Sequence, residues 1–171
     1  MEMKEAAEAY CRVIEAARGA ERSTFANEVA MSLSAVVAAA YRLPDVDLDS
    51  STVFVGPGEP ISHARWFSRM KDIQSVLEDW DNYWTTHDAY YVDETTGLPD
   101  FYLGTLEEKV ANLSLADDLA DIWRDLQNGL DSLSRGMTLK EVTWDWRLTF
   151  GSHWGAHATE ALRAIHQQVT D

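Results

Sequence analysis

Apolar side chains recur every three to four residues along most of the chain, which is the spacing that places them on one face of an α-helix. The first predicted helix ends before Gly19, and its apolar positions are Ala6, Tyr10, Val13, Ile14 and Ala17. A second helix is predicted to begin at residues 23–24 and to end at residues 41–42, because Pro44 cannot continue it. Both helices therefore have one side suited to burial.

Two further helices follow from the same period. A long third helix is predicted to begin near residues 60–62, and a single stripe carries Trp66, Met70, Ile73, Leu77, Trp80 and Trp84. A fourth helix is predicted to begin at Ser114, where Asp117 stands in the place of a capping-box residue, and to end at Gly136.

The last predicted helix begins at a capping box formed by Thr138 and Glu141. It reaches about Val169 unless the glycines at positions 151 and 155 kink or break it. Short turns between long helices favour antiparallel neighbours. The sequence therefore predicts an all-α fold, a four- to five-helix bundle in which residues 1–171 form a single domain.

Two segments lack the helical period. Residues 45–60 are acidic and then rich in Gly and Pro, which predicts a loop. In residues 87–104, two aromatic clusters flank a turn-like sequence, so either an irregular loop or a small hairpin is expected. Thr105 and Glu108 then form a capping box for a short helix.

The charge balance limits the partners. The chain has 14 basic and 29 acidic residues and a formal net charge of −15. Nucleic-acid affinity comes largely from Lys and Arg that displace counterions, so direct binding to DNA or RNA is not expected. The single cysteine, Cys11, favours a reducing compartment. The N-terminal residues lack the pattern of a signal peptide and the longest apolar run is short, so we expect a cytoplasmic protein without a membrane partner.

Four aspartates share one sector of the helix predicted to begin at Ser114, beside its apolar face: Asp117, Asp118, Asp121 and Asp125. Carboxylates from facing helices can hold Mg²⁺, as they do in all-helical phosphohydrolases. The alternative, which we favour, is a solvated acidic face close to the positive end of the helix dipole.

His153 and His157 are four residues apart in the last predicted helix, so they lie one above the other. This spacing can chelate zinc, and Glu160 is within reach of the same side. The H-E-x-x-H signature of metalloproteases is absent, and a helical wheel places His157 in the apolar stripe with His153 at its edge. We therefore favour hydrogen-bonded structural histidines over metal ligands.

Arg147 also projects toward the apolar side of the last predicted helix. A buried guanidinium needs a carboxylate, because an unpaired buried charge is very costly. The predicted partners are Asp118, Asp121 and Asp125. The aspartates would then belong to a structural network between two helices and be less available to a metal.

Seven tryptophans are many for this length, and four of them lie on predicted core stripes: Trp66, Trp80, Trp84 and Trp154. Trp123 and Trp144 lie off the centres of their stripes. Exposed tryptophan is a common anchor of protein interfaces. Trp123 and Trp144, with Tyr90 and Tyr91, are therefore the candidate interface.

The C-terminal half carries a distinctive run of motifs. Residues 114–126 read SLADDLADIWRDL, residues 144–147 read WDWR and residues 153–158 read HWGAHA. Together with Leu-Pro-Asp at positions 43–45, these motifs resemble a bacterial family known as domain of unknown function 5063. The resemblance implies a helical fold and a bacterial origin, and it brings no established activity, substrate or catalytic residue.

Two classes of function are compatible with these patterns. The leading hypothesis is a non-enzymatic helical binding or adaptor protein that contacts an unidentified protein partner and needs no metal or cofactor. The alternative is a metal-dependent phosphohydrolase. In that case Mg²⁺ or Mn²⁺ would be held by Asp117, Asp118, Asp121 and either Glu141 or Asp145.

Overall fold

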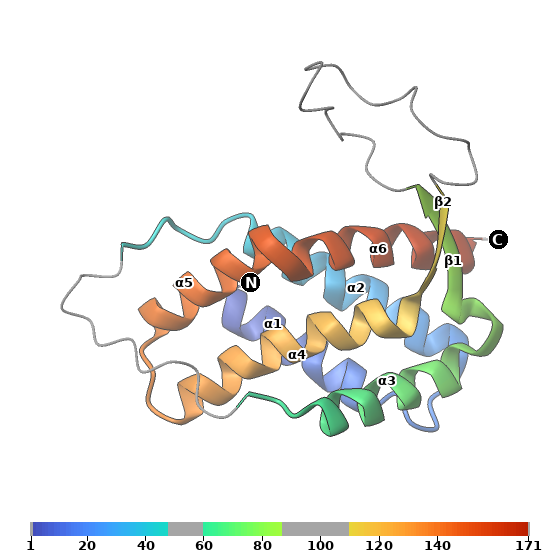
Figure 1. Ribbon diagram of the computed structural model, residues 1–171, viewed down its shortest axis with the longest axis horizontal. Coiled ribbons are helices and arrows are strands. Elements are labelled where there is room, and N and C mark those ends of the chain that lie inside the picture. Colours follow the sequence, from blue (N-terminus) through green and yellow to red (C-terminus); the bar gives the residue numbers. More distant parts are fainter. Residues whose placement is uncertain (1, 48–59, 87–109, 171) are drawn as a thin grey trace, which may run out of the picture.

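The computed structural model describes residues 2–47, 60–86 and 110–170. These ranges contain six α-helices and one two-stranded antiparallel hairpin (Figure 1). The helices are α1 (Met3–Glu15), α2 (Arg22–Ala40), α3 (His63–Leu77), α4 (Leu115–Ser134), α5 (Leu139–Thr149) and α6 (Gly155–Thr170). The strands are β1 (Asn82–Thr86) and β2 (Val110–Ser114), and the 3-10 turn η1 (Glu78–Asp81) joins α3 to β1. The predicted all-α bundle is confirmed.

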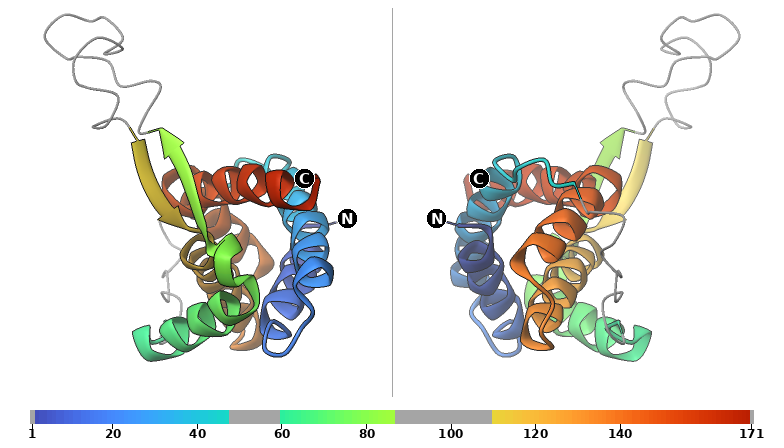
Figure 2. Two further views of the ribbon diagram at one scale, coloured as in Figure 1. Left: turned by 90° about the vertical axis from the view of Figure 1, so that its right-hand side faces the viewer. Right: turned by 90° about the vertical axis from the view of Figure 1, so that its left-hand side faces the viewer.

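Helix α4 is the centre of the bundle, since it contacts α1, α3, α5 and α6. In the end-on views of Figure 2, α1 and α2 lie side by side along one side of the bundle, with α6 across its upper edge and α3 at its lower edge. The core between them includes Tyr10, Phe25, Leu33, Ile73, Leu119, Trp123, Trp146 and Trp154. A helix covered on several sides has only a narrow face left for polar residues, and on α4 the aspartates occupy it.

Most helix ends follow the predicted capping chemistry. The Ser114 hydroxyl accepts a hydrogen bond from the backbone N–H of Asp117, and Thr138 and Glu141 form the predicted capping box. Helix α2 differs, because it begins at Arg22 with the Glu21 carboxylate accepting from the backbone N–H groups of Ser23 and Thr24.

Among the described helices, α2 alone is long and apolar enough to cross a membrane by length and composition. Seven of its residues are buried in the bundle, among them Val29, Leu33 and Val36. Burial against α1 and α6 accounts for this apolar content.

The third helix is shorter than predicted. It ends at Leu77, because Glu78 has a φ of +53°, which no α-helix continues. Trp84 therefore lies on strand β1 and is 64% exposed, so its predicted place on a core stripe is wrong. Trp66 and Trp80 are partly buried against the core, and Trp154 is fully buried.

Trp123 is also placed differently from the prediction. It is fully buried, between the core and the guanidinium groups of Arg65 and Arg69 from α3. The candidate interface at Trp123 is therefore wrong, because α3 covers a side of α4 that the helical wheel leaves open. Trp144 is partly buried on α5. Tyr90, Tyr91, the hairpin or loop at 87–104 and the helix predicted at Thr105 lie outside the described residues, as does most of the loop predicted at 45–60.

The last predicted helix is interrupted where the two glycines are. A π-helical turn (η3, Phe150–Trp154) joins α5 to α6, and the two helices run in different directions on either side of it (Figure 1). A Cβ on Gly155 would lie 2.3 Å from the carbonyl oxygen of Phe150, so only glycine permits this close turn. The wide turn breaks the 3.6-residue period. A single helical wheel therefore cannot predict which residues before the turn share a face with residues after it.

Candidate metal centre

Two histidine–aspartate pairs join the π turn and α6 to helix α4. Nδ1 of His157 lies 2.7 Å from Oδ1 of Asp118, and Nδ1 of His153 lies 2.7 Å from Oδ2 of Asp125. Both distances are those of charge-assisted hydrogen bonds. The acidic sector of α4 and the two histidines, which the sequence identified separately, thus meet in one cluster.

Asp121 lies between the two pairs. Its Oδ2 atom is 3.7 Å from Nε2 of His153 and 3.7 Å from Nε2 of His157. These separations are too long for hydrogen bonds. Two ligand atoms bound to one tetrahedral zinc ion, each about 2.0–2.1 Å from it, lie about 3.3 Å apart. The three side chains each offer one such atom, all within 4.8 Å of one another, which is close to the spacing of a metal site.

The hydrogen bonds of the imidazoles also suit a metal. When Nδ1–H donates to a carboxylate, Nε2 keeps its lone pair and can bind a cation. Metal-binding histidines almost always have such a partner on the other ring nitrogen, which fixes the ring and raises its basicity. Here Asp118 and Asp125 supply that partner to His157 and His153.

Asp121 is the remaining carboxylate of the cluster. Its side chain is 13% exposed, and Nη2 of Arg124 lies 2.8 Å from its Oδ1 atom. That contact lacks hydrogen-bond geometry, so Oδ1 stays without a hydrogen bond inside the protein. Oδ2 faces the two imidazoles and is the atom that a cation would bind.

The cluster concentrates negative charge. The hydrogen bond to Asp118 raises the pKa of His157 against the opposing effect of burial. Burial, and then repulsion by Asp121 and Asp118, raises the pKa of Asp117. A divalent cation at this place would relieve the repulsion between these carboxylates.

The cluster is open to solvent on one side. The side chains of His153 and His157 are 38% and 28% exposed, whereas Asp118 is 4% exposed. An ion held by Asp121 and the two imidazoles would therefore keep positions for water or another ligand. Three protein ligands with an open position are typical of catalytic metal sites.

Tyr83 on strand β1 completes the cluster, and sequence patterns gave no signal for it. Its hydroxyl donates to Oδ2 of Asp118, across 35 residues of sequence. Both carboxylate oxygens of Asp118 therefore have a hydrogen-bond partner within the protein. Burial, and then this hydrogen bond, raises the pKa of Tyr83.

Arg147 does not reach the aspartates, so its predicted pairing with Asp118, Asp121 or Asp125 is wrong. Its Nη1 atom donates to the carbonyl oxygen of Leu43 at 2.7 Å, and its Nε atom lies 3.8 Å from Oδ1 of Asp45. The π turn explains the difference, because the helical wheel assumed an unbroken helix from 138 to 169.

The other predicted ligands lie outside the cluster or next to it. Glu141 caps α5, and Glu160 accepts from Thr85 and pairs with Arg163. Asp145 does not share a metal-ligand group with the histidines, although burial and then the charge of Asp125 raise its pKa.

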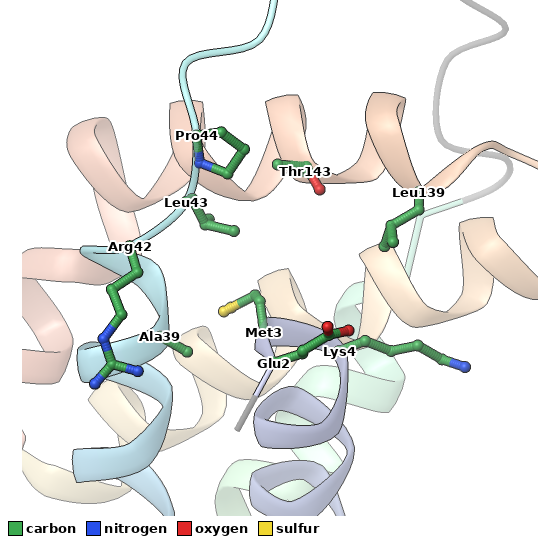
Figure 3. A pocket seen from close by; sticks show the side chains of 9 residues that line it. All are labelled: Glu2, Met3, Lys4, Ala39, Arg42, Leu43, Pro44, Leu139 and Thr143. Carbon is green, nitrogen blue, oxygen red and sulfur yellow. The ribbon is translucent and has the colours of Figure 1, made fainter.

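A cavity of about 440 Å³ lies elsewhere, between α1, the end of α2 and α5 (Figure 3). Met3 and Leu43 extend toward its centre, while the charged ends of Lys4 and Arg42 extend away from them. Glu2 is the one carboxylate among the residues that line it, and none of them is a histidine or a cysteine. It shares no residue with the histidine–aspartate cluster.

The fold and the cluster define a helical-bundle protein in which two histidines, from the π turn and α6, meet the aspartates of the central helix α4. The chain belongs to the family described as "Domain of unknown function (DUF5063)", whose model matches residues 1–171. The family assignment from the C-terminal motifs is thereby confirmed.

A similar fold has been solved in protein BF1032 from Bacteroides fragilis. Its crystal structure superimposes with a TM-score of 0.74 at 20% sequence identity, covering 99% of this chain and 93% of that chain. At this identity the likeness shows the fold alone. The comparison with curated proteins gave no match.

Proposed function

We propose that the protein binds one divalent transition-metal ion through Oδ2 of Asp121 and the Nε2 atoms of His153 and His157. One observation carries the proposal: each imidazole is held by a carboxylate at 2.7 Å on Nδ1 while its Nε2 atom faces the same oxygen of Asp121. This is the hydrogen-bonding pattern of metal-binding histidines. The open side of the cluster favours a catalytic metal over a structural one.

The donor set favours particular metals. Two imidazoles and one carboxylate suit Zn²⁺, Fe²⁺ and similar ions, whereas Mg²⁺ prefers oxygen ligands alone. Of the carboxylates proposed for a Mg²⁺ site, Asp118 is fully used by His157 and Tyr83, and Glu141 caps α5. The Mg²⁺ or Mn²⁺ phosphohydrolase hypothesis therefore loses two of its proposed ligands, Asp118 and Glu141.

The charge around the site favours one class of substrate. A divalent ion together with Arg124 would offset three of the four negative charges on Asp117, Asp118, Asp121 and Asp125. The site would stay negative, which opposes the approach of a phosphate or another anion. We therefore propose a metal-dependent enzyme that acts on a neutral or cationic substrate, with a metal-bound water as the reacting group.

The adaptor hypothesis has less support. Its main anchor, Trp123, is fully buried, and Trp144 is partly buried. Two expectations from the sequence spoke against a metal: that His157 is buried in the apolar stripe, and that Arg147 forms ion pairs with the aspartates. His157 is partly exposed, and Arg147 binds elsewhere.

Thermal unfolding of the metal-free protein tests the proposal. A ligand at a hundred times its Kd stabilises a folded protein by about 2.7 kcal/mol. We expect Zn²⁺ to raise the melting temperature beyond the effect of Mg²⁺ and of monovalent salt at matched ionic strength. The shift should disappear in His157→Ala and persist in His166→Ala, a control histidine exposed on the same helix. Equal shifts with Zn²⁺ and Mg²⁺, or a shift retained in His157→Ala, would contradict the proposal.

A further inference from the structure

The β1–β2 hairpin is linked to the candidate metal centre through three side chains. The Tyr83 hydroxyl donates to Oδ2 of Asp118, and Oδ1 of the same carboxylate is 2.7 Å from Nδ1 of His157. Tyr83 and Asp118 are 5% and 4% exposed, so water does not compete for these contacts. A continuous chain of hydrogen bonds therefore runs from the hairpin to the imidazole whose Nε2 atom faces Asp121.

The pleat of β1 directs Tyr83 inward. Side chains alternate along a strand, so Tyr83 is buried while the next residue, Trp84, is exposed. The hairpin register pairs Tyr83 with Leu113, two residues before α4 begins. The hydroxyl therefore reaches Asp118 in the first turn of α4.

Two other contacts hold the same strand without touching Asp118. The Thr85 hydroxyl donates to Oε2 of Glu160 at 2.9 Å, and Nη2 of Arg163 donates to the carbonyl oxygen of Trp84 at 3.0 Å. Thr85 thus carries a hydroxyl on the same strand. Its hydrogen-bond partner lies on α6 and does not belong to the series of hydrogen bonds that leads to His157. It provides a matched control for Tyr83.

We propose that Tyr83 is a positioning residue of the metal centre, and that metal binding and docking of the hairpin stabilise each other. The inference rests on the proposed function. With its hydroxyl in place, Tyr83 fixes the carboxylate that orients His157; without it, one oxygen of a buried carboxylate loses its hydrogen bond. Because binding linkage is reciprocal, an ion that holds His157 in its bound orientation also favours the docked hairpin.

The test compares Tyr83→Phe, which removes the hydroxyl and keeps the ring, with Thr85→Val. The affinity for Zn²⁺ is measured by competition with a chromophoric chelator, and Co²⁺ absorption reports the ligand geometry. Loss of the carboxylate partner of a metal-binding histidine weakens binding by about 10- to 100-fold. Tyr83 contacts that carboxylate and not the histidine itself, so we expect a loss at the lower end of this range, about 10-fold, and an altered Co²⁺ spectrum in Tyr83→Phe. We expect the parent's affinity and spectrum in Thr85→Val.

Hydrogen exchange supplies a second readout, in the parent and in both variants. We expect Zn²⁺ to slow amide exchange in residues 82–86 and 110–114 of the parent and of Thr85→Val, with little effect in Tyr83→Phe. If the parent binds Zn²⁺ but hairpin exchange is unchanged, or if Tyr83→Phe binds as tightly as the parent, the coupling is overturned while the proposed function stands. If the parent binds no Zn²⁺, the proposed function fails, and this inference fails with it.

Discussion

His157 and Asp118 form the more deeply buried of the two imidazole–carboxylate pairs, with Nδ1 of His157 2.7 Å from Oδ1 of Asp118. Asp118 also accepts from Tyr83, whereas burial, and then the charges of Asp121 and Asp118, raise the pKa of the neighbouring Asp117. Two adjacent aspartates on one helix therefore differ in what they contribute to the metal-free protein.

We predict different effects on stability from removing these two carboxylates. Asp118→Ala leaves the buried Tyr83 hydroxyl without its acceptor and should lower the free energy of unfolding by about 1–3 kcal/mol. Asp117→Ala should leave stability unchanged or raise it, because burial and the charges of Asp121 and Asp118 disfavour the ionised Asp117. Chemical denaturation in the presence of a chelator measures both. Equal losses from the two variants would contradict this account of the acidic sector.

A second prediction concerns Gly129, where α4 meets α5. A Cβ at this position would lie 2.2 Å from Nε1 of Trp146. Gly129→Ala should therefore cost about 1–3 kcal/mol of stability through overpacking. Gly151→Ala is the control, since nothing lies within 4 Å of its Cβ position, and it should be neutral or stabilising. Thermal unfolding of the two variants would disprove the α4–α5 contact if both melted alike.

A third prediction follows from the observed place of Arg147. Its side chain is 45% exposed, and its acidic neighbour Asp45 is 91% exposed. Exposed ion pairs contribute under about 1 kcal/mol, whereas breaking a buried pair costs about 3–5 kcal/mol. Arg147→Ala should therefore melt close to the parent. A large loss of stability would instead favour the buried pairing with α4.

The acid stability of the chain should depend on Glu21. Backbone hydrogen bonds from Thr24 and Ser23 lower its pKa from 4.5 to about 2. A carboxyl with a lowered pKa in the folded state stabilises the fold above its unfolded pKa, and this contribution is lost as the pH falls toward the folded value. Glu21→Gln should thus lower the melting temperature at pH 7, and its difference from the parent should shrink between pH 4.5 and about 2. A difference that is constant over this range would contradict the capping role.

Local signals in the sequence predicted the helices well. The capping box at Thr138, the cap at Ser114 and the helix ends near Gly19 and Gly136 are all encoded within a few residues, and both glycines have positive φ. The end of α3 at Leu77 was missed, because the apolar stripe runs on past the positive φ of Glu78.

The candidate site was predicted in parts. The aspartates of α4 and the histidines at 153 and 157 stand out by spacing, but their pairing depends on how the π turn rotates α6 against α4. A helical wheel drawn through that turn predicted that Arg147 contacts the aspartates. In the structure His153 and His157 contact them instead. Tyr83 lies 35 residues before Asp118 in the sequence, and no local pattern encodes such a contact.

Calorimetric titration of the metal-free chain with Zn²⁺ tests the central claim most directly. We predict one ion bound per chain by the parent and by His166→Ala, and a binding isotherm lost or strongly weakened in His153→Ala and in Asp121→Ala. Absence of saturable binding by the parent, or the parent's affinity in both His153→Ala and Asp121→Ala, would contradict the claim that these residues form a metal centre.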